Sequence, residues 1–384
     1  MTTTPRARVA ITQPYVPAYR FPLWDRIVST LSDQGVETRV FYGGDTEQLA
    51  IRAERGDGVD APWAQQVEVS TVALSAKLPK LMLRRLPRDW AGALLVTEMQ
   101  GSNLNAWTAA ARGRPFITFG HGRSYTSTEG RVSMGLENTL NRRARHVLTY
   151  TEAGRETVLA RTGRPPATVT AFRNATDTSA LRAVLADTGP ADTERFRAAH
   201  GIPADAKLAL YLGALNRHKR IELLAAAAER VFAADPDWWL VVAGAGEETS
   251  RLRALAERTG RVVLLGQASA PDYAPVARVA RLLVNPGRIG LVAVDALVMG
   301  LPILAAHGDL NAPEAEYLRE GRDVLTVDAD PAAYARAWLG WSHGRSEGPS
   351  DALPTVEQAA DAVSGAILAE LGIGLESGRT AVAR

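Results

Sequence analysis

Short apolar runs and helical stretches alternate along the first half of the chain. The runs of strand length stand at residues 8–12, 37–42, 93–97, 116–119 and 146–150. The stretches with helical spacing of apolar residues stand between them, at 23–31, 103–111 and 152–161. Strands that alternate with helices predict a parallel sheet that carries helices on both faces.

The same pattern restarts in the second half. Its strand-like runs are residues 208–213, 239–244, 262–266, 282–285 and 302–305, and its helical stretches are 220–233, 249–259, 273–278 and 290–299. The pattern predicts an α/β fold of two Rossmann-like, doubly wound domains facing a cleft, without an internal sequence repeat.

The domain boundaries follow from where the pattern stops and restarts. We predict an N-terminal domain over residues 1–178 and a C-terminal domain over 205–341, joined near 178–205. Residues 193–200 within the join are expected to form a short helix. A last helix, at 355–372, is expected to return to the N-terminal domain.

Composition narrows the possible chemistry. The chain has 384 residues, 46% hydrophobic and 22% charged, and no cysteine. This excludes disulfides, thiolate zinc sites and a cysteine nucleophile. We find no secretory signal and no window of roughly 18 uninterrupted apolar residues, so a cytoplasmic protein is expected.

Charge is unevenly distributed, although the net charge is only +2. Residues 1–180 hold 23 Lys and Arg against 16 Asp and Glu, and the remainder is net acidic. A basic N-terminal half favours an anionic acceptor or an anionic membrane surface as partner. A chance imbalance on a solvated surface is the competing interpretation.

Two loops of the C-terminal half lie between a strand and a helix. In the first, residues 213–220, the cations Arg217 and Lys219 stand where a diphosphate would meet a helix N-terminus; the alternative is a solvated basic turn. In the second, Gly244 and Gly246 would let a ligand or another backbone approach closely, and the alternative is an ordinary turn.

A third loop precedes the helix at 290–299. The amides of Gly290 and Leu291 open this helix and could bind phosphate without a side chain. Asp295 follows in the helix, where its carboxylate could accept hydrogen bonds from ribose hydroxyls. A buried, hydrogen-bonded core acid is the alternative for Asp295, because apolar residues surround it.

Taken in order, these loops resemble the donor domain of the GT-B-fold retaining glycosyltransferases, family 4. Residues 173–177 resemble that family's Asn-Gly-Val-Asp turn, residues 212–219 its phosphate loop, and residues 286–302 its Glu-x-Phe-Gly-Leu…Glu-Ala…Gly-Leu-Pro signature. The donor-binding residues implied by the resemblance are Gly213, Arg217, Lys219, Gly244, Gly246, Gly266, Gly287, Arg288, Ile289, Gly290, Leu291 and Asp295.

Three positions depart from the family pattern. Ala214 replaces an arginine, for which Arg217 would substitute, and Asp295 replaces the second glutamate. Gly287 replaces the first glutamate, which in the family contacts the hydroxyls of the donor sugar. Its loss predicts more room at this point and a deoxy or substituted sugar; Arg288 could instead meet an acidic one.

The N-terminal half resembles the family less closely. By resemblance His121 would lie near the transferred sugar and act with Arg217 and Lys219 in catalysis; a structural histidine is the alternative. Residues that follow strands are expected to line the acceptor site: Tyr15, Tyr19, Arg20, Glu98, Gln100 and Asn103. The basic segment 77–88 is interpreted either as an amphipathic segment on an anionic membrane or as a surface helix.

Together these patterns predict a glycosyltransferase that moves a hexosyl or deoxyhexosyl group from a nucleotide diphosphate sugar to a hydroxyl of a glycan, glycolipid or small molecule. The resemblance implies retention of anomeric configuration. We expect no obligatory metal or cofactor and no nucleic-acid partner. A nucleotide-sugar epimerase and a non-catalytic nucleotide-sugar-binding subunit remain alternatives.

Overall fold

The computed structural model describes residues 7–44, 49, 61–73, 80–123, 130–308, 311–342, 344–345 and 353–374. The chain forms two compact units. Unit 1 comprises Met1–Asp177 and Pro354–Arg384, and unit 2 comprises Thr178–Leu353.

Unit 1 contains a seven-stranded parallel sheet in the order β3-β2-β1-β6-β7-β8-β9. The strands are β1 (Ala7–Gln13), β2 (Val36–Tyr42), β3 (Ala64–Gln66), β6 (Leu94–Glu98), β7 (Phe116–Gly120), β8 (His146–Thr149) and β9 (Val169–Ala171). Every residue of β6, β7 and β8 is buried, as expected for a parallel sheet covered on both faces. The strand order reverses between β1 and β6.

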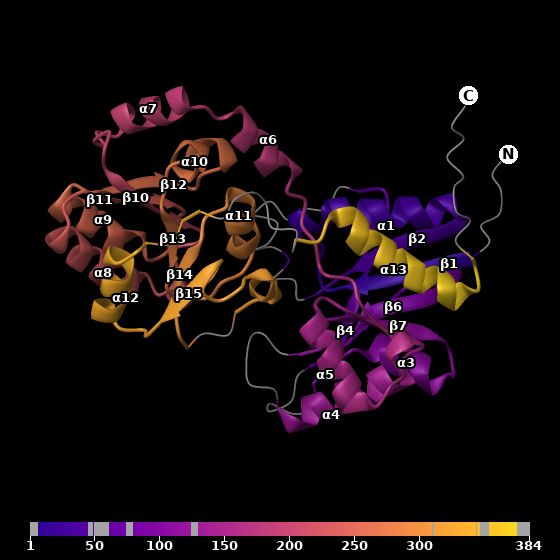
Figure 1. Cartoon of the computed structure of the whole chain (residues 1–384). Helices are drawn as coiled ribbons and strands as arrows, with labels where there is room; N and C mark the ends of the chain where they lie inside the picture. The colour runs from indigo at the N-terminus through magenta and orange to yellow at the C-terminus, as the bar shows by residue number, and fades with distance from the viewer. Residues whose placement is uncertain are drawn as a thin grey trace, which may run out of the picture. The chain divides into compact units, whose positions relative to one another are not determined.

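Among the described residues, the α-helices of this unit are α1 (Phe21–Asp33), α3 (Leu104–Ala111), α4 (Arg131–Arg143), α5 (Glu152–Thr162) and α13 (Val356–Leu371). The last of these, α13, begins at a capping box of Thr355 and Gln358. It lies along α1 (Figure 1), and its buried Val363 and Ile367 join the core that contains Trp24 of α1.

A two-stranded antiparallel sheet stands beside α3 in unit 1. It pairs β4 (Val69–Val72) with β5 (Leu81–Arg84). A helix over the basic segment 77–88 is therefore wrong for its described part, which forms β5 and a 3-10 turn at Arg88–Trp90. Residues 77–79 lie outside the described residues. In a strand Leu81 and Leu83 share one face and Met82 and Arg84 the other. Arg84 points into the unit, where it is 2% exposed.

Unit 2 contains a six-stranded parallel sheet in the order β12-β11-β10-β13-β14-β15. The strands are β10 (Lys207–Leu212), β11 (Trp238–Ala243), β12 (Val262–Gly266), β13 (Leu282–Asn285), β14 (Ile303–Ala306) and β15 (Val324–Val327). This is the order of a Rossmann sheet, and it reverses between β10 and β13. Ligands of such sheets bind beyond the carboxyl ends of the strands at that reversal.

The helices of unit 2 are α6 (Ser179–Asp187), α7 (Pro190–Ala199), α8 (Ile221–Ala234), α9 (Thr249–Thr259), α10 (Ala270–Ala277), α11 (Val292–Met299) and α12 (Pro331–Leu339). Helices α6 and α7 occupy the predicted join and pack on α10. Helix α7 begins earlier than predicted because Pro190 fits its first position and the Asp192 carboxylate accepts from the Gly189 N–H. Among the helices described, none is long and apolar enough to cross a membrane.

Candidate functional site

Three loops of unit 2 leave the carboxyl edge of the sheet at the reversal of strand order. The register pairs Leu212 of β10 with Ala243 of β11, and Leu210 of β10 with Leu283 of β13. The loops that follow β10, β11 and β13 therefore emerge next to one another. We call residues 213–219, which follow β10, the central loop.

On one side, the central loop packs against the loop after β11. The N–H of Gly213 donates to the Ala243 carbonyl (3.0 Å), and the N–H of Leu215 donates to the Ala245 carbonyl (2.9 Å). A Cβ at position 244 or 246 would overlap a carbonyl oxygen of the central loop. Gly244 and Gly246 were predicted to allow close approach of a ligand or of another backbone segment, and the structure shows another backbone segment there.

On its other side, the central loop packs against the loop after β13. The N–H of Arg288 donates to the His218 carbonyl (3.0 Å), and the Lys219 ammonium donates to the Arg288 carbonyl (2.5 Å). A Cβ at Gly287 would overlap the His218 carbonyl oxygen and stand 2.5 Å from the Lys219 Cα. The predicted extra room at Gly287 is therefore wrong, because backbone fills that space.

Lys219 is a half-buried cation. Burial, together with the charge of the neighbouring Arg288 guanidinium, lowers its pKa to about 8. No ion pair from the described residues neutralises Lys219, so the site brings two positive charges together beside a carbonyl. Such an arrangement favours an anionic ligand.

The N-terminus of α11 adds hydrogen-bond donors next to these cations. Within the described part of the chain, the amides of Gly290, Leu291 and Val292 have no acceptor, as is usual for the first turn of a helix. Asp295 follows on the same helix. Burial raises the pKa of Asp295 to about 6, and no described residue donates a hydrogen bond to its carboxylate. This differs from the hydrogen-bonded core acid that was the alternative.

The other predicted donor residues fall into two groups. Arg217 is exposed, and Gly266 ends β12 with no atom within 4 Å of its Cβ position, so both are accessible. Ile289 is 2% exposed and its N–H donates to the Asn311 side chain (2.8 Å). Ile289 is therefore part of the hydrophobic core, whereas Leu291 is 37% exposed and lies at the surface.

In unit 1, His121 follows β7 at the carboxyl edge of the sheet. Its side chain is exposed, and its ring meets the Tyr150 ring edge to face at 4.3 Å. The backbone of His121 and Gly122 packs against Gly154 of α5, where a Cβ on either glycine would overlap backbone. The loop that carries His121 is therefore held firmly on the end of α5.

Arg20 contacts the same tyrosine as His121. It is 6% exposed, its guanidinium donates to the Tyr150 hydroxyl (2.8 Å), and it stands 4.5 Å from the centre of that ring. Its Nε is buried without a hydrogen-bond partner in the described chain. Tyr19 is 40% exposed and Tyr15 is half-buried. The structure thus brings Tyr19, Arg20 and His121 together around Tyr150.

Glu98 and Asn103 form a separate, internal group. The Glu98 carboxylate pairs with the Arg84 guanidinium (3.0 Å) and accepts from the Asn103 amide (3.1 Å). Burial raises the pKa of Glu98, and the Arg84 charge acts in the opposite direction. Asn103 also caps α3. Of the three acceptor residues predicted here, only Gln100 is exposed.

The candidate residues thus form a cationic edge of unit 2 and an aromatic edge of unit 1. Residues 206–341 match the family model "Glycosyl transferases group 1", and residues 24–175 match "Glycosyl transferase 4-like domain". Together the matches span three quarters of the chain. The chain belongs to the group 1 glycosyltransferases.

Curated relatives of this group 1 chain include D-inositol 3-phosphate glycosyltransferases. One from Catenulispora acidiphila is 34% identical over 163 residues, and one from Acidothermus cellulolyticus is 32% identical over 165 residues. The first match covers 38% of each protein, and the second covers 38% of this chain and 36% of the relative. The chain thus matches well under half the length of these relatives.

Solved structures extend the likeness of the fold over nearly the whole group 1 chain. Anabaena HepE in complex with UDP has a TM-score of 0.56 at 16% identity and covers 94% of this chain and 95% of its own. UDP-GlcNAc 2-epimerase from Neisseria meningitidis has a TM-score of 0.57 at 12% identity, with coverages of 94% and 100%. At these identities the likeness concerns the fold.

Two tyrosines at the cationic edge of unit 2 and the aromatic edge of unit 1 were not among the site residues predicted from the sequence. Tyr273 of α10 lies near the Asp295 carboxylate; burial, together with that charge, raises the pKa of Tyr273 to about 12. Tyr150 unites Arg20 and His121. Neither tyrosine belongs to a motif, so only its position after a strand or on a neighbouring helix could have indicated it.

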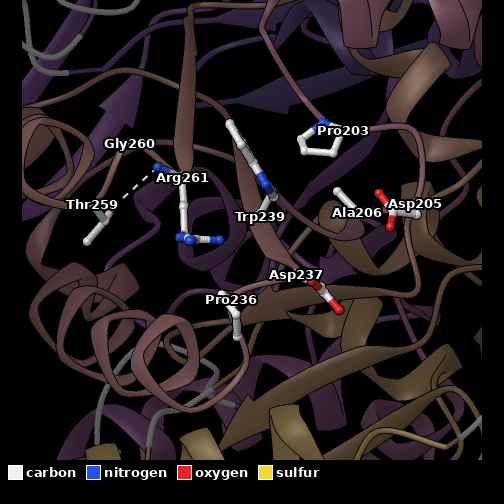
Figure 2. A pocket seen from close by; sticks show the side chains of 9 residues that line it. All are labelled: Pro203, Asp205, Ala206, Pro236, Asp237, Trp239, Thr259, Gly260 and Arg261. Carbon is white, nitrogen blue, oxygen red and sulfur yellow. Dashed lines mark hydrogen bonds between the residues drawn. The ribbon is translucent and has the colours of Figure 1, made fainter.

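A cavity of about 290 Å³ lies at the opposite edge of the unit 2 sheet (Figure 2). Its walls include Ala206, Asp237 and Arg261, which precede β10, β11 and β12. The six residues of β10 separate it from the central loop by roughly 20 Å. This cavity is therefore distinct from the cationic edge.

Proposed function

We propose that this protein transfers a sugar from a nucleotide diphosphate sugar to an acceptor hydroxyl, with the donor bound by unit 2. The observation that carries the proposal is the Lys219 ammonium, half-buried beside the Arg288 guanidinium and in the same group of loops as the open amides of α11. A diphosphate supplies the negative charge that this arrangement lacks, through charge-assisted hydrogen bonds.

The donor residues would divide their work by chemistry. Lys219, Arg217 and the amides at Gly290 and Leu291 would hold the diphosphate and stabilise it as it leaves. The Asp295 carboxylate, which no described residue satisfies, would accept from the ribose hydroxyls. The sugar–diphosphate bond breaks with its electron pair on the diphosphate. The acceptor oxygen bonds to the anomeric carbon and its hydroxyl proton passes to the departing diphosphate.

We propose that this transfer retains the anomeric configuration, as the family resemblance implies. No pair of carboxylates stands out as nucleophile and acid, so no covalent intermediate is assigned. No metal is part of the proposal. The anomer of the product, read by NMR before it equilibrates, tests the stereochemistry directly.

For the acceptor we propose a hydroxyl-bearing molecule bound by unit 1 near His121, Tyr19 and Arg20. Arg20 is a buried cation that contacts phenol groups, and the described residues place no carboxylate beside it. This favours an acceptor with an anionic group, and relatives named for inositol 3-phosphate make phosphorylated polyols the first compounds to test.

An epimerase has the same fold, since UDP-GlcNAc 2-epimerases are among the similar structures. The two family matches favour transfer over epimerisation. Incubation with UDP-sugars, with and without acceptors, separates the candidates. Transfer releases UDP and consumes acceptor, whereas an epimerase forms an epimeric sugar nucleotide without acceptor, and a binding subunit does neither.

A further inference from the structure

Gly287 is the point at which two loops of the donor edge come into backbone contact. Its own Cβ position is occupied by the His218 carbonyl oxygen and lies 2.5 Å from both the Cα and the carbonyl carbon of Lys219. Real Cβ atoms essentially never stand that close to backbone, so a side chain at 287 would force the central loop away.

Two hydrogen bonds depend on that contact. The Arg288 N–H donates to the His218 carbonyl at 3.0 Å, and the Lys219 ammonium donates to the Arg288 carbonyl at 2.5 Å. Both join the residue after Gly287 to the end of the central loop. Moving the loops apart far enough to admit a methyl group would lengthen both contacts well past about 3.2 Å, the usual upper limit of an N–H···O hydrogen bond, and so would break them.

We propose that Gly287 is a positioning residue for Lys219, and that it does not itself recognise the donor sugar. With no side chain at 287, the loop after β13 docks on the central loop and fixes the ammonium at the Arg288 carbonyl. Lys219 is then held in place before the diphosphate arrives, next to the amides at the start of α11. This inference rests on the proposed binding of a nucleotide diphosphate by unit 2.

The variant Gly287→Ala tests the proposal, with UDP and UDP-glucose as probes in calorimetric titrations. We expect both ligands to bind about tenfold to a hundredfold more weakly, by the same factor, because a charge-assisted contact to the diphosphate they share is lost. If position 287 recognised the sugar, only UDP-glucose binding would change. That outcome overturns the proposal.

A double-mutant cycle with Lys219→Ala tests whether the effect passes through the lysine. We expect Gly287→Ala to weaken UDP binding further by less than twofold once Lys219 is absent. A full additional loss would show that Gly287 acts independently of Lys219. Gly189→Ala is the matched control, since its Cβ would meet only the Asp192 side chain, at 3.6 Å, in an extended backbone.

The pH dependence of UDP affinity distinguishes a role through Lys219 from a purely structural role of Gly287, because a purely structural role would leave that dependence unchanged. In the unaltered protein the affinity should fall above about pH 8, where the half-buried Lys219 loses its proton. In Gly287→Ala the fall should begin at higher pH, towards the ordinary lysine value of 10.5. An unaltered protein whose UDP affinity stays level to pH 10 would refute the inference even if the variant did not fold.

Failure of the proposed function gives a different result from failure of this inference. If the unaltered protein bound neither UDP nor any other nucleoside diphosphate, the diphosphate assignment itself would be wrong. If it bound UDP and Gly287→Ala bound UDP equally well while remaining folded by circular dichroism, only the role of Gly287 would be lost.

Discussion

Replacing Asp295 by asparagine should stabilise unit 2 and weaken nucleotide binding at the same time. Burial raises the pKa of Asp295 from 3.8 to about 6. The folded state therefore favours the protonated acid, and the stability that this acid contributes is present below pH 3.8 and lost as pH rises through about 6. At pH 7.5 the ionised carboxylate lowers the free energy of unfolding, and asparagine removes this destabilisation.

The size of the effect follows from the shift. About two pKa units correspond to about 3 kcal/mol at 1.36 kcal/mol per unit, which is the upper limit of the gain in free energy of unfolding. For a domain the size of unit 2, each kcal/mol raises Tm by roughly 2–4 °C. We expect Asp295→Asn to raise the Tm of unit 2 by several degrees at pH 7.5 and to change it little near pH 4.

Nucleotide binding should move in the opposite direction. An amide oxygen is a weaker acceptor than a carboxylate, and the difference of about 1 kcal/mol lowers UDP affinity by roughly fivefold to tenfold. Differential scanning calorimetry at both pH values and titration with UDP measure the two effects. The exposed Asp328→Asn removes one negative charge elsewhere in unit 2 and serves as the control.

Two results would refute this reasoning. Destabilisation at pH 7.5 would mean that the Asp295 carboxylate has a stabilising partner in the fold, as the core-acid interpretation holds. Unchanged UDP affinity in a folded variant would place the ribose elsewhere. If the protein bound no nucleotide, the predicted gain in stability would still hold, because it depends only on the burial of Asp295.

Three further predictions concern other parts of the molecule. Lys219→Ala should lower catalytic efficiency towards the donor by about tenfold to a hundredfold, measured by initial rates of UDP release, because a contact of about 1.5–3 kcal/mol to the diphosphate is lost; unchanged donor kinetics would contradict this. Arg84→Ala should destabilise unit 1 by about 3–5 kcal/mol in urea unfolding, because it leaves the Glu98 carboxylate charged and buried. The double variant Arg84→Met with Glu98→Leu should recover much of that stability. If the single and the double variant lost the same stability, the ion pair would not be the cause. If the basic segment 77–88 contacts anionic lipid, co-sedimentation with phosphatidylserine vesicles should fall with added salt, and binding indifferent to lipid charge and salt would count against it.

The arrangement of strands was predictable because periodicity reports burial directly. The predicted helix at 249–259 and strand at 282–285 have the bounds found in the structure. Helix α4 was missed because its sequence is mostly polar and contains Gly135, and its Val132 and Leu136 are exposed, by 62% and 39%. The segment around Leu81–Arg84 looked helical because leucines and cations at short intervals fit both periods over so few residues.

Contacts between distant residues were beyond the sequence. Glu98 looked like an acceptor group because it follows a strand, but its partner Arg84 comes from an antiparallel ribbon whose position against α3 no local pattern specifies. Gly287 looked like a missing side chain. Its neighbour is a carbonyl sixty-nine positions earlier, which only the packing of two loops brings close.

The filled space at Gly287 changes where donor recognition has to be sought. If backbone occupies that point, the sugar must be read by side chains that reach the same edge, and those available on the two loops are Arg217, His218 and Arg288. The two guanidinium groups have no hydrogen-bond acceptor and a neutral imidazole has only one, whereas a carboxylate has two acceptor oxygens. The three side chains match the oxygens of the diphosphate and of any acidic or acylated sugar. In the proposed donor site, the charge of this edge would therefore favour the phosphates, and the discrimination between sugars would fall to groups elsewhere that accept hydrogen bonds.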